Sequence, residues 1–337
     1  MSRNRAHGAD RDQGDDGAPD LTDSVDHNDD FSDHDDSSDH SDDSNDHDDD
    51  PVDHDDSYVD HDNSVGHDNS VDLNAVVGSC DIALITLDTL RYDVAQRLFL
   101  EGRTPTLARH LPACGWEERH APGNFTYAAH AAIFAGFFPT PARPGVHPRP
   151  FAVSFAGSST ITAKTCVFDA PDIVTGLAGR GYHTACIGGV GFFNKQNPIG
   201  SAFPSLFDES HWEPAFGVTD RDSTRHQIDA ALALMGRLEA RRRLFLFINV
   251  SALHQPNRHY LPGATRDSIA SHAAALEYVD GQLGRLFDAM GRRAATFVVI
   301  CADHGTAYGE DGYTGHRLGH EVVWTVPYAE LLLSAPA

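Results

Sequence analysis

Residues 297–305 read Phe297-Val-Val-Ile-Cys-Ala-Asp303-His304-Gly305, an apolar run of strand length that ends in two potential metal ligands. Neighbouring side chains of a strand point to opposite faces, so Asp303 and His304 can converge only where the chain leaves the strand. Gly305 permits that turn because glycine has no Cβ atom. A buried Asp-His pair without a partner is costly, and carboxylate oxygen together with imidazole nitrogen suits Zn, Mn or Fe. We therefore predict a metal site at the end of this strand.

Comparable apolar runs recur along the chain, at residues 82–87, 184–187, 245–250 and 328–333. Helical patterns separate them, at residues 91–100, 128–137, 171–179, 221–241 and 269–290. Strands that alternate with helices form a largely parallel sheet with helices on both faces. We predict this α/β fold for residues 75–337, with ligands bound beyond the carboxyl ends of the strands.

The negative charge of the chain is concentrated before this region. The 337 residues include 50 acidic and 25 basic side chains, a formal net charge of −25. Residues 1–72 contain 26 Asp, no Glu and three Arg, which is −23 of that total and leaves −2 for the rest. A segment this rich in Asp contains few apolar side chains, and burying them cannot offset the conformational entropy that folding costs. We predict residues 1–74 as a disordered acidic tail, either a solvated polyanion or a loose collector of metal ions through its His and Asp side chains.

The remaining composition predicts the environment and the partners. Five cysteines in no Cys-x-x-Cys spacing indicate neither a disulfide framework nor a zinc-thiolate site. No stretch approaches the roughly 20 apolar residues of a membrane span. A nearly neutral body argues against nucleic acid, whose phosphates require clustered Lys and Arg. We expect a cytoplasmic protein without nucleic-acid or membrane partners, and the oligomeric state stays open.

Two further segments place polar side chains at predicted strand or helix ends. Asp88 directly follows the strand at 81–87 and is either a ligand or a helix cap, since no Glu or Gln follows to complete a capping box. In Thr126-Tyr-Ala-Ala-His130, Thr126 starts an Ala-rich helix, where free N–H groups favour an anion. His130 lies one turn on, on the same face. Taken alone, each segment is also explained by simple capping.

Three more histidines follow the same pattern. His254 comes after the strand at 245–250, and His316 and His320 lie in a Gly-rich loop before the last strand. A single surface histidine is usually incidental. Several segments, distant in sequence, place ligand-type residues at predicted strand ends, and capping alone does not explain that coincidence.

In their order, these segments resemble the alkaline phosphatase and sulfatase superfamily, over essentially all of residues 75–337. The resemblance implies one divalent metal ion, Zn first with Mn or Mg as alternatives, and leaves a second ion open. It implies Thr126 as the nucleophile that also touches the metal. His254 would face the substrate anion. In the mechanism that we expect, His130, His254 and His316 are the candidates to hold the oxygens of the anion or to protonate the leaving group. The implied ligands of the first metal, besides Thr126, are Asp88, Asp303 and His304. His316 and His320 match the region that supplies a ligand of a second metal or a contact to the phosphate.

The departures from that family narrow the expected chemistry. Sulfatases carry Cys or Ser followed by x-Pro-Ser-Arg, where this chain has Thr126-Tyr-Ala-Ala-His130, so the precursor of formylglycine is absent. A sulfatase-type motif at residues 181–188 ends in Gly189 instead of Lys. No Asp or Glu lies between residues 245 and 260, where two-metal members carry a carboxylate. A Thr nucleophile resembles instead the phosphodiesterase, phosphoethanolamine transferase and phosphomutase branches.

We therefore predict a metal-dependent hydrolase or transferase of small-molecule phosphate-type esters, with Thr126 as nucleophile. Two alternatives remain: a sulfuric ester hydrolase without formylglycine, and a non-catalytic metal-binding protein supplied by the tail. We expect the substrate pocket in residues 140–165 and 189–220.

Overall fold

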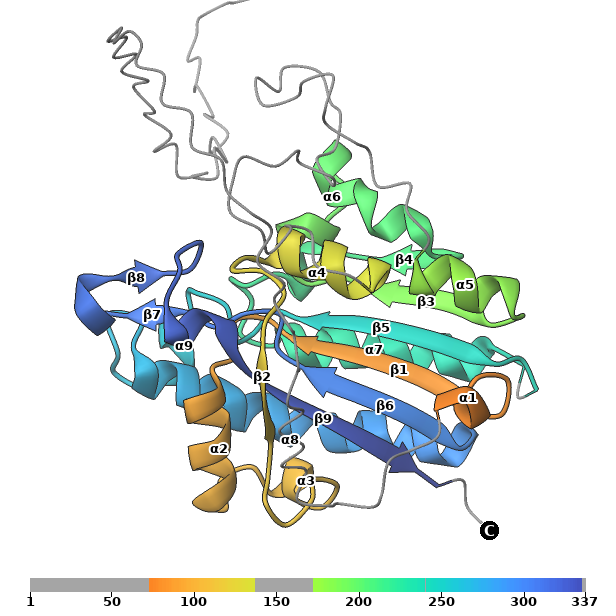
Figure 1. The fold of residues 1–337 in the computed structure, drawn as a ribbon, viewed down its shortest axis with the longest axis horizontal. Helices are drawn as coiled ribbons and strands as arrows, with labels where there is room; N and C mark the ends of the chain where they lie inside the picture. Colours follow the sequence, from red (N-terminus) through yellow and green to blue (C-terminus); the bar gives the residue numbers. More distant parts are fainter. Residues whose placement is uncertain (1–72, 137–171, 240, 335–337) are drawn as a thin grey trace, which may run out of the picture. The chain divides into compact units, whose positions relative to one another are not determined.

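The computed structural model describes residues 73–136, 172–239 and 241–334, and a seven-stranded sheet forms its centre (Figure 1). The strand order is β2-β9-β6-β1-β5-β3-β4. The strands are β1 (Asp81–Leu87), β2 (Glu117–His120), β3 (His183–Ile187), β4 (Glu209–His211), β5 (Leu244–Val250), β6 (Thr296–Cys301) and β9 (Thr325–Leu333). A separate two-stranded sheet consists of β7 (Ala307–Tyr308) and β8 (Thr314–Gly315).

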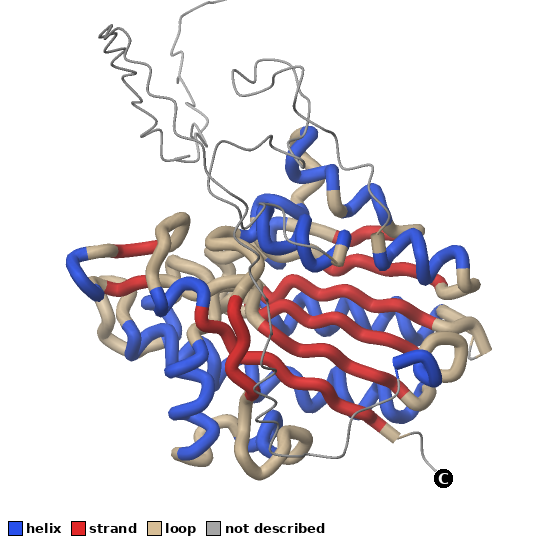
Figure 2. Tube along the Cα trace, viewed as in Figure 1, coloured by secondary structure: helices blue, strands red, loops and turns tan. Residues whose placement is uncertain are grey.

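Helices lie on both sides of the strands (Figure 2). They are α1 (Leu73–Val76), α2 (Tyr92–Leu100), α3 (Pro105–Ala108), α4 (Thr126–Ala135), α5 (Ile173–Gly179), α6 (Pro198–Ala202), α7 (Ser223–Arg237), α8 (Ile269–Arg293) and α9 (Glu321–Trp324). The 3-10 turns are η1 (Gly191–Phe193), η2 (Pro204–Leu206), η3 (Pro214–Phe216), η4 (Arg258–Tyr260) and η5 (Glu310–Gly312). None of the helices in the described ranges is long and apolar enough to span a lipid bilayer.

The period-two pattern of the strands divides the core into two layers. Along β1, Ala83 and Ile85 pack into one cluster with α2, α7 and α8. Ile82 and Leu84 point the other way and pack with α4 and α5. A strand that buries both of its faces needs apolar residues at nearly every position, which is why β1 and β5 read as continuous apolar runs.

The predicted fold class is confirmed, with one addition. Strands β4, β3, β5, β1 and β6 run parallel, whereas β9 pairs antiparallel with β6 and β2 pairs antiparallel with β9. A parallel return needs a long crossover, and between β6 and β9 the only α-helix is the four-residue α9. Residues 1–72 of the predicted tail and the predicted pocket loop at 140–165 lie outside the described residues, and residues 73 and 74, which were also assigned to the tail, belong to α1.

Candidate active site

Two carboxylates and one imidazole meet at the carboxyl ends of β1 and β6. These strands are neighbours, with Thr86 opposite Cys301, so the residues that follow them lie side by side. The ligand-type atoms of Asp88, Asp303 and His304 all lie within 4.8 Å of one another, and all three residues are fully buried. The structure therefore brings together three of the residues predicted as metal ligands.

Thr126 completes this group from the first turn of α4. Its Oγ1 lies 3.4 Å from Asp88 Oδ2 and 3.3 Å from His304 Nε2, and the residue is buried. The residue that caps α4 is Phe125, and the one that caps α2 is Arg91. Capping therefore explains neither Thr126 nor Asp88.

The electrostatics of the group fit a bound cation. Burial, together with the neighbouring Asp303, raises the pKa of Asp88 to about 6, and burial raises that of Asp303 to about 7. Asp88 Oδ1 and Asp303 Oδ2 are buried and accept no hydrogen bond within the described residues. Buried carboxylate oxygens without donors are costly unless they are paired or coordinate a metal.

The tautomer of His304 also fits a metal ligand. Its Nδ1 lies 2.8 Å from the Gly305 carbonyl oxygen and donates to it, which leaves the lone pair on Nε2 facing Thr126 and the carboxylates. A metal-binding histidine commonly fixes its ring in this way. The residues that would hold a divalent ion are thus Asp88, Asp303, His304 and Thr126.

Asn249 supports Asp88 and was not anticipated from the sequence. Its Nδ2 donates to Asp88 Oδ2 at 3.0 Å and lies 3.3 Å from Thr86 Oγ1. The available signal was a single amide within the otherwise apolar strand β5. Gly189 packs so tightly against this residue that a Cβ atom at position 189 would collide with the Asn249 carbonyl oxygen.

His130 lies behind Thr126. Its Nδ1 is 2.8 Å from the Thr126 carbonyl oxygen and its Nε2 is 3.0 Å from Thr86 Oγ1. Its ring packs edge-on against Phe193 and Phe247, and burial lowers its pKa to about 3. Because both ring nitrogens are engaged inside the core, the predicted contact of His130 with substrate oxygens does not fit this geometry.

His254 and His316 lie on the open side of the group. The His316 ring centroid is 4.7 Å from that of His304 and 5.4 Å from that of His254. Burial lowers the pKa of His316 to about 3, so the ring is a neutral donor at neutral pH. Both histidines and Thr126 line a cavity of about 560 Å³.

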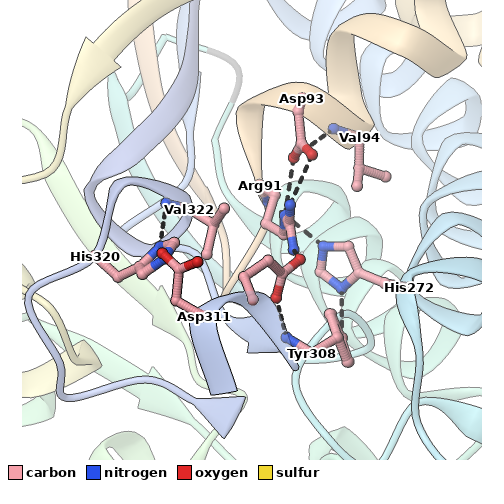
Figure 3. Close-up of polar contacts among 9 residues, drawn as sticks. Arg91, Asp93, Val94, His272, Tyr308, Asp311, His320 and Val322 are labelled. Atoms are coloured by element: carbon pink, nitrogen blue, oxygen red, sulfur yellow. Dashed lines mark hydrogen bonds and ion pairs between the residues drawn. The ribbon is translucent and has the colours of Figure 1, made fainter. Parts of the chain in front are cut away.

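His320, predicted as a ligand, is engaged elsewhere. Its Nδ1 accepts the Val322 N–H at 3.2 Å and caps α9, and its Nε2 lies 3.2 Å from Asp311 Oδ2 (Figure 3). Both nitrogens are therefore used locally, and the prediction of His320 as a ligand is corrected. The loop brings His316, and not His320, to the group.

A polar network around the buried Arg91 side chain ties together the segments that follow β1 and β6 (Figure 3). The Arg91 side chain is only 4% exposed, and its guanidinium forms ion pairs with Asp93 and Glu310. His272 accepts the Arg91 backbone N–H at 3.5 Å through Nε2, and its Nδ1 lies 3.1 Å from the Tyr308 hydroxyl. The network thus fixes the chain shortly after Asp88 to the chain shortly after His304.

Comparison with known proteins shows the family of the chain. The model of the family described as Sulfatase matches residues 84–328. No curated protein matches the chain.

Several solved structures share the fold at low identity. The C-terminal periplasmic domain of phosphoethanolamine transferase EptC from Campylobacter jejuni is 11% identical, with a TM-score of 0.50 over 75% of this chain and 79% of that one. The corresponding domain from Escherichia coli, in complex with Zn, is 11% identical, with a TM-score of 0.53 over 77% and 74%. The soluble domain of lipooligosaccharide phosphoethanolamine transferase A from Neisseria meningitidis is 14% identical, with a TM-score of 0.50 over 77% and 78%.

The predicted cytoplasmic location is corrected by these comparisons, because similar structures are periplasmic domains. Its basis was weak on physical grounds too: a core of this size needs no disulfides, so unpaired cysteines do not identify a reducing compartment. The family match over residues 84–328 agrees with the order of the strands, the buried carboxylates and Thr126 at the start of α4, and the chain belongs to the sulfatase family of the alkaline phosphatase superfamily.

Proposed function

We propose that this protein is a metal-dependent hydrolase or transferase of phosphate esters, with Thr126 as its nucleophile. One observation carries the proposal. The Thr126 hydroxyl lies at the N-terminus of α4, within 3.4 Å of Asp88 and 3.3 Å of His304, and borders a cavity large enough for an organic ester.

In this proposal Asp88, Asp303, His304 and the Thr126 hydroxyl hold the metal. The ion, when bound, lowers the pKa of that hydroxyl and offsets negative charge on the ester. The residues favour such an ion because two buried carboxylate oxygens have no donor among the described residues. Zn fits the mixed oxygen and nitrogen ligand set, and Mn or Mg are the alternatives.

The chain's own groups then carry the transfer. As the Oγ–P bond forms, the P–O bond to the alcohol breaks, and the alcohol leaves with a proton. The N–H groups in the first turn of α4 have no partner within the helix, and in this proposal they stabilise the charge of the phosphate oxygens. His254 and His316, on the open side, donate to those oxygens or to the leaving group. Water or an acceptor alcohol then takes the phosphoryl group from Thr126 and regenerates the hydroxyl.

A sulfuric ester hydrolase is the second candidate, because the family model that matches is the sulfatase model. Two features favour phosphate. Thr126 cannot be oxidised to formylglycine, and Gly189 stands where the resemblance places a lysine. Relative turnover of matched aryl phosphates, phosphodiesters and sulfates separates the two candidates.

The deciding experiment compares Thr126→Ala with Thr126→Ser on that panel. The proposal expects Thr126→Ala to lower kcat by at least about a thousandfold, with bound metal retained, and Thr126→Ser to keep measurable turnover. Thr175→Ala, at an exposed threonine of α5, is the matched control and leaves turnover unchanged. Undiminished activity of Thr126→Ala overturns the nucleophile assignment. Absence of turnover in the metal-loaded wild type supports the non-catalytic alternative.

A further inference from the structure

The cavity beside Thr126 has two chemically different sides. Its volume of about 560 Å³ lies within the roughly 300–1,000 Å³ of sites for organic ligands. One side carries His254, His316 and Arg317. The rest of its lining consists mainly of the apolar residues Val190, Phe192, Pro198, Ile199 and Val218, here called the apolar wall, together with Gly191, Asn194 and Asn197.

The apolar wall is attached directly to the nucleophile helix. The Phe192 ring packs against those of Phe125 and Tyr127, at centroid distances of 6.4 Å and 5.6 Å. These two aromatic residues flank Thr126 in the chain. The apolar wall therefore begins next to the reacting hydroxyl.

The wall is also preformed by local hydrogen bonds and core packing. Asn197 caps α6 by accepting the Gly200 N–H at 2.8 Å, which fixes the turn that presents Pro198 and Ile199. Phe193, next to Phe192 in η1, is 1% exposed and anchors the turn in the core. A wall held in this way needs little ordering when a ligand binds.

We infer that this cavity binds the organic part of the ester, and that it selects an alkyl or aryl group over a polyol or sugar. The inference rests on the proposed function, because it places the phosphate at Thr126 and His316. Beyond them, an apolar group would remove Phe192 and Ile199 from water, which favours binding. Hydroxyl groups of a sugar would lose water without finding partners among the apolar side chains. The Oδ1 atoms of Asn194 and Asn197 already accept the backbone N–H groups of Gln196 and Gly200.

Calorimetric titration of the full-length, Zn-supplemented protein with methyl-, butyl- and hexylphosphonate tests this inference. These probes share the anionic group and are not ester substrates, so binding is read without turnover. We expect Kd to fall about two- to fourfold for each added methylene, and a polyol phosphonate of similar length to bind no tighter than methylphosphonate. Ile199→Asn flattens that dependence, and Ile199→Val gives an intermediate slope.

Ile173→Asn is the matched control, because Ile173 is 44% exposed on α5 and does not line the cavity. It keeps the wild-type slope. Equal Kd values along the series, a polyol that binds as tightly as hexyl, or an unchanged slope in a folded Ile199→Asn protein would overturn the inference. Failure of the proposed function has a different signature: phosphonates bind with the expected slope, but no phosphate or sulfate ester is turned over.

Discussion

The Asn249 amide donates a hydrogen bond to Asp88 Oδ2 at 3.0 Å, from the strand that pairs with the one preceding Asp88. The middle strand thus contributes to the site through an amide and not through the carboxylate that two-metal relatives would require. Asn249 holds Asp88 in place without adding negative charge to the buried group. That relationship leads to the first prediction.

Asn249→Ala is expected to weaken Zn binding about 10- to 100-fold, because a ligand that loses its supporting hydrogen bond loses its fixed orientation. Competition with a chromophoric chelator measures the change in Kd. Gln96→Ala is the control, since the Gln96 amide bonds to the backbone of Cys114 and Trp116, outside this site. Equal affinities of wild type and Asn249→Ala would contradict the supporting role.

Asp303→Asn is expected to change the Tm of the metal-free protein and that of the metal-bound protein in different ways. With chelator present, the variant should have a Tm at least equal to the wild-type value, because it carries one buried charge fewer beside Asp88. With Zn, the wild-type Tm should rise and the variant's should not. Differential scanning calorimetry measures both. The exposed Asp288 offers the control Asp288→Asn, and a variant that still gained Tm with Zn would remove Asp303 from the ligand set.

His130→Gln tests positioning by a side chain behind the nucleophile. Thr86 and the Thr126 carbonyl lose the ring that joins them, so kcat should fall about ten- to a hundredfold through misplacement of the hydroxyl. KM should change little, because the ring does not line the cavity. Steady-state kinetics gives both constants. A large rise in KM with kcat unchanged would restore the original prediction that His130 contacts the substrate.

His272 should make stability depend on pH. Burial, together with the nearby Arg91 charge, lowers its pKa to about 4, whereas an unfolded histidine titrates near about 6.5. Between these values the unfolded state binds more protons, so this contribution is complete above about pH 6.5 and is lost as the pH falls towards 4. It amounts to about 3 kcal/mol.

Urea unfolding of wild type and His272→Gln across that range measures this effect. The Asp93 and Glu310 carboxylates also face this network, so the quantity to compare is the difference between the two proteins. The variant should show the shallower loss of unfolding free energy on acidification. Parallel curves would mean that His272 is protonated in the folded protein as readily as in the unfolded one.

The predictable part of this molecule consists of residues whose position follows from the end of an element. Asp88 directly follows β1, and Asp303 and His304 follow β6 after one intervening residue. Parallel strands bring their carboxyl ends to one edge, so the sequence indicated that these residues meet. Their meeting also requires β1 and β6 to be neighbours, because strands lie about 4.8 Å apart. That order, β6-β1-β5, is found in the structure and was not read from the sequence.

Other features depend on contacts that no local pattern encodes. Strand β2 consists of Glu117-Glu118-Arg119-His120, four exposed residues without apolar alternation, and its pairing with β9 determines its conformation. His130 lies one helical turn from Thr126, as expected. Its burial, however, comes from contacts with the rings of Phe193 and Phe247, which are far away in the sequence. The conformation of the loop decides that His316, and not His320, lies near the site, because the His320 ring contacts Asp311 instead.

The close approach of Gly189 to Asn249 limits how this scaffold can be redesigned. Introducing the lysine of a sulfatase-type motif at position 189 would push the Asn249 carbonyl away and disturb the strand that supports Asp88. The lysine of that motif therefore cannot be introduced at position 189 by a single substitution without moving Asn249. A redesign that needs a positive charge here would use Arg317, which already lines the cavity, and would keep Gly189 unchanged.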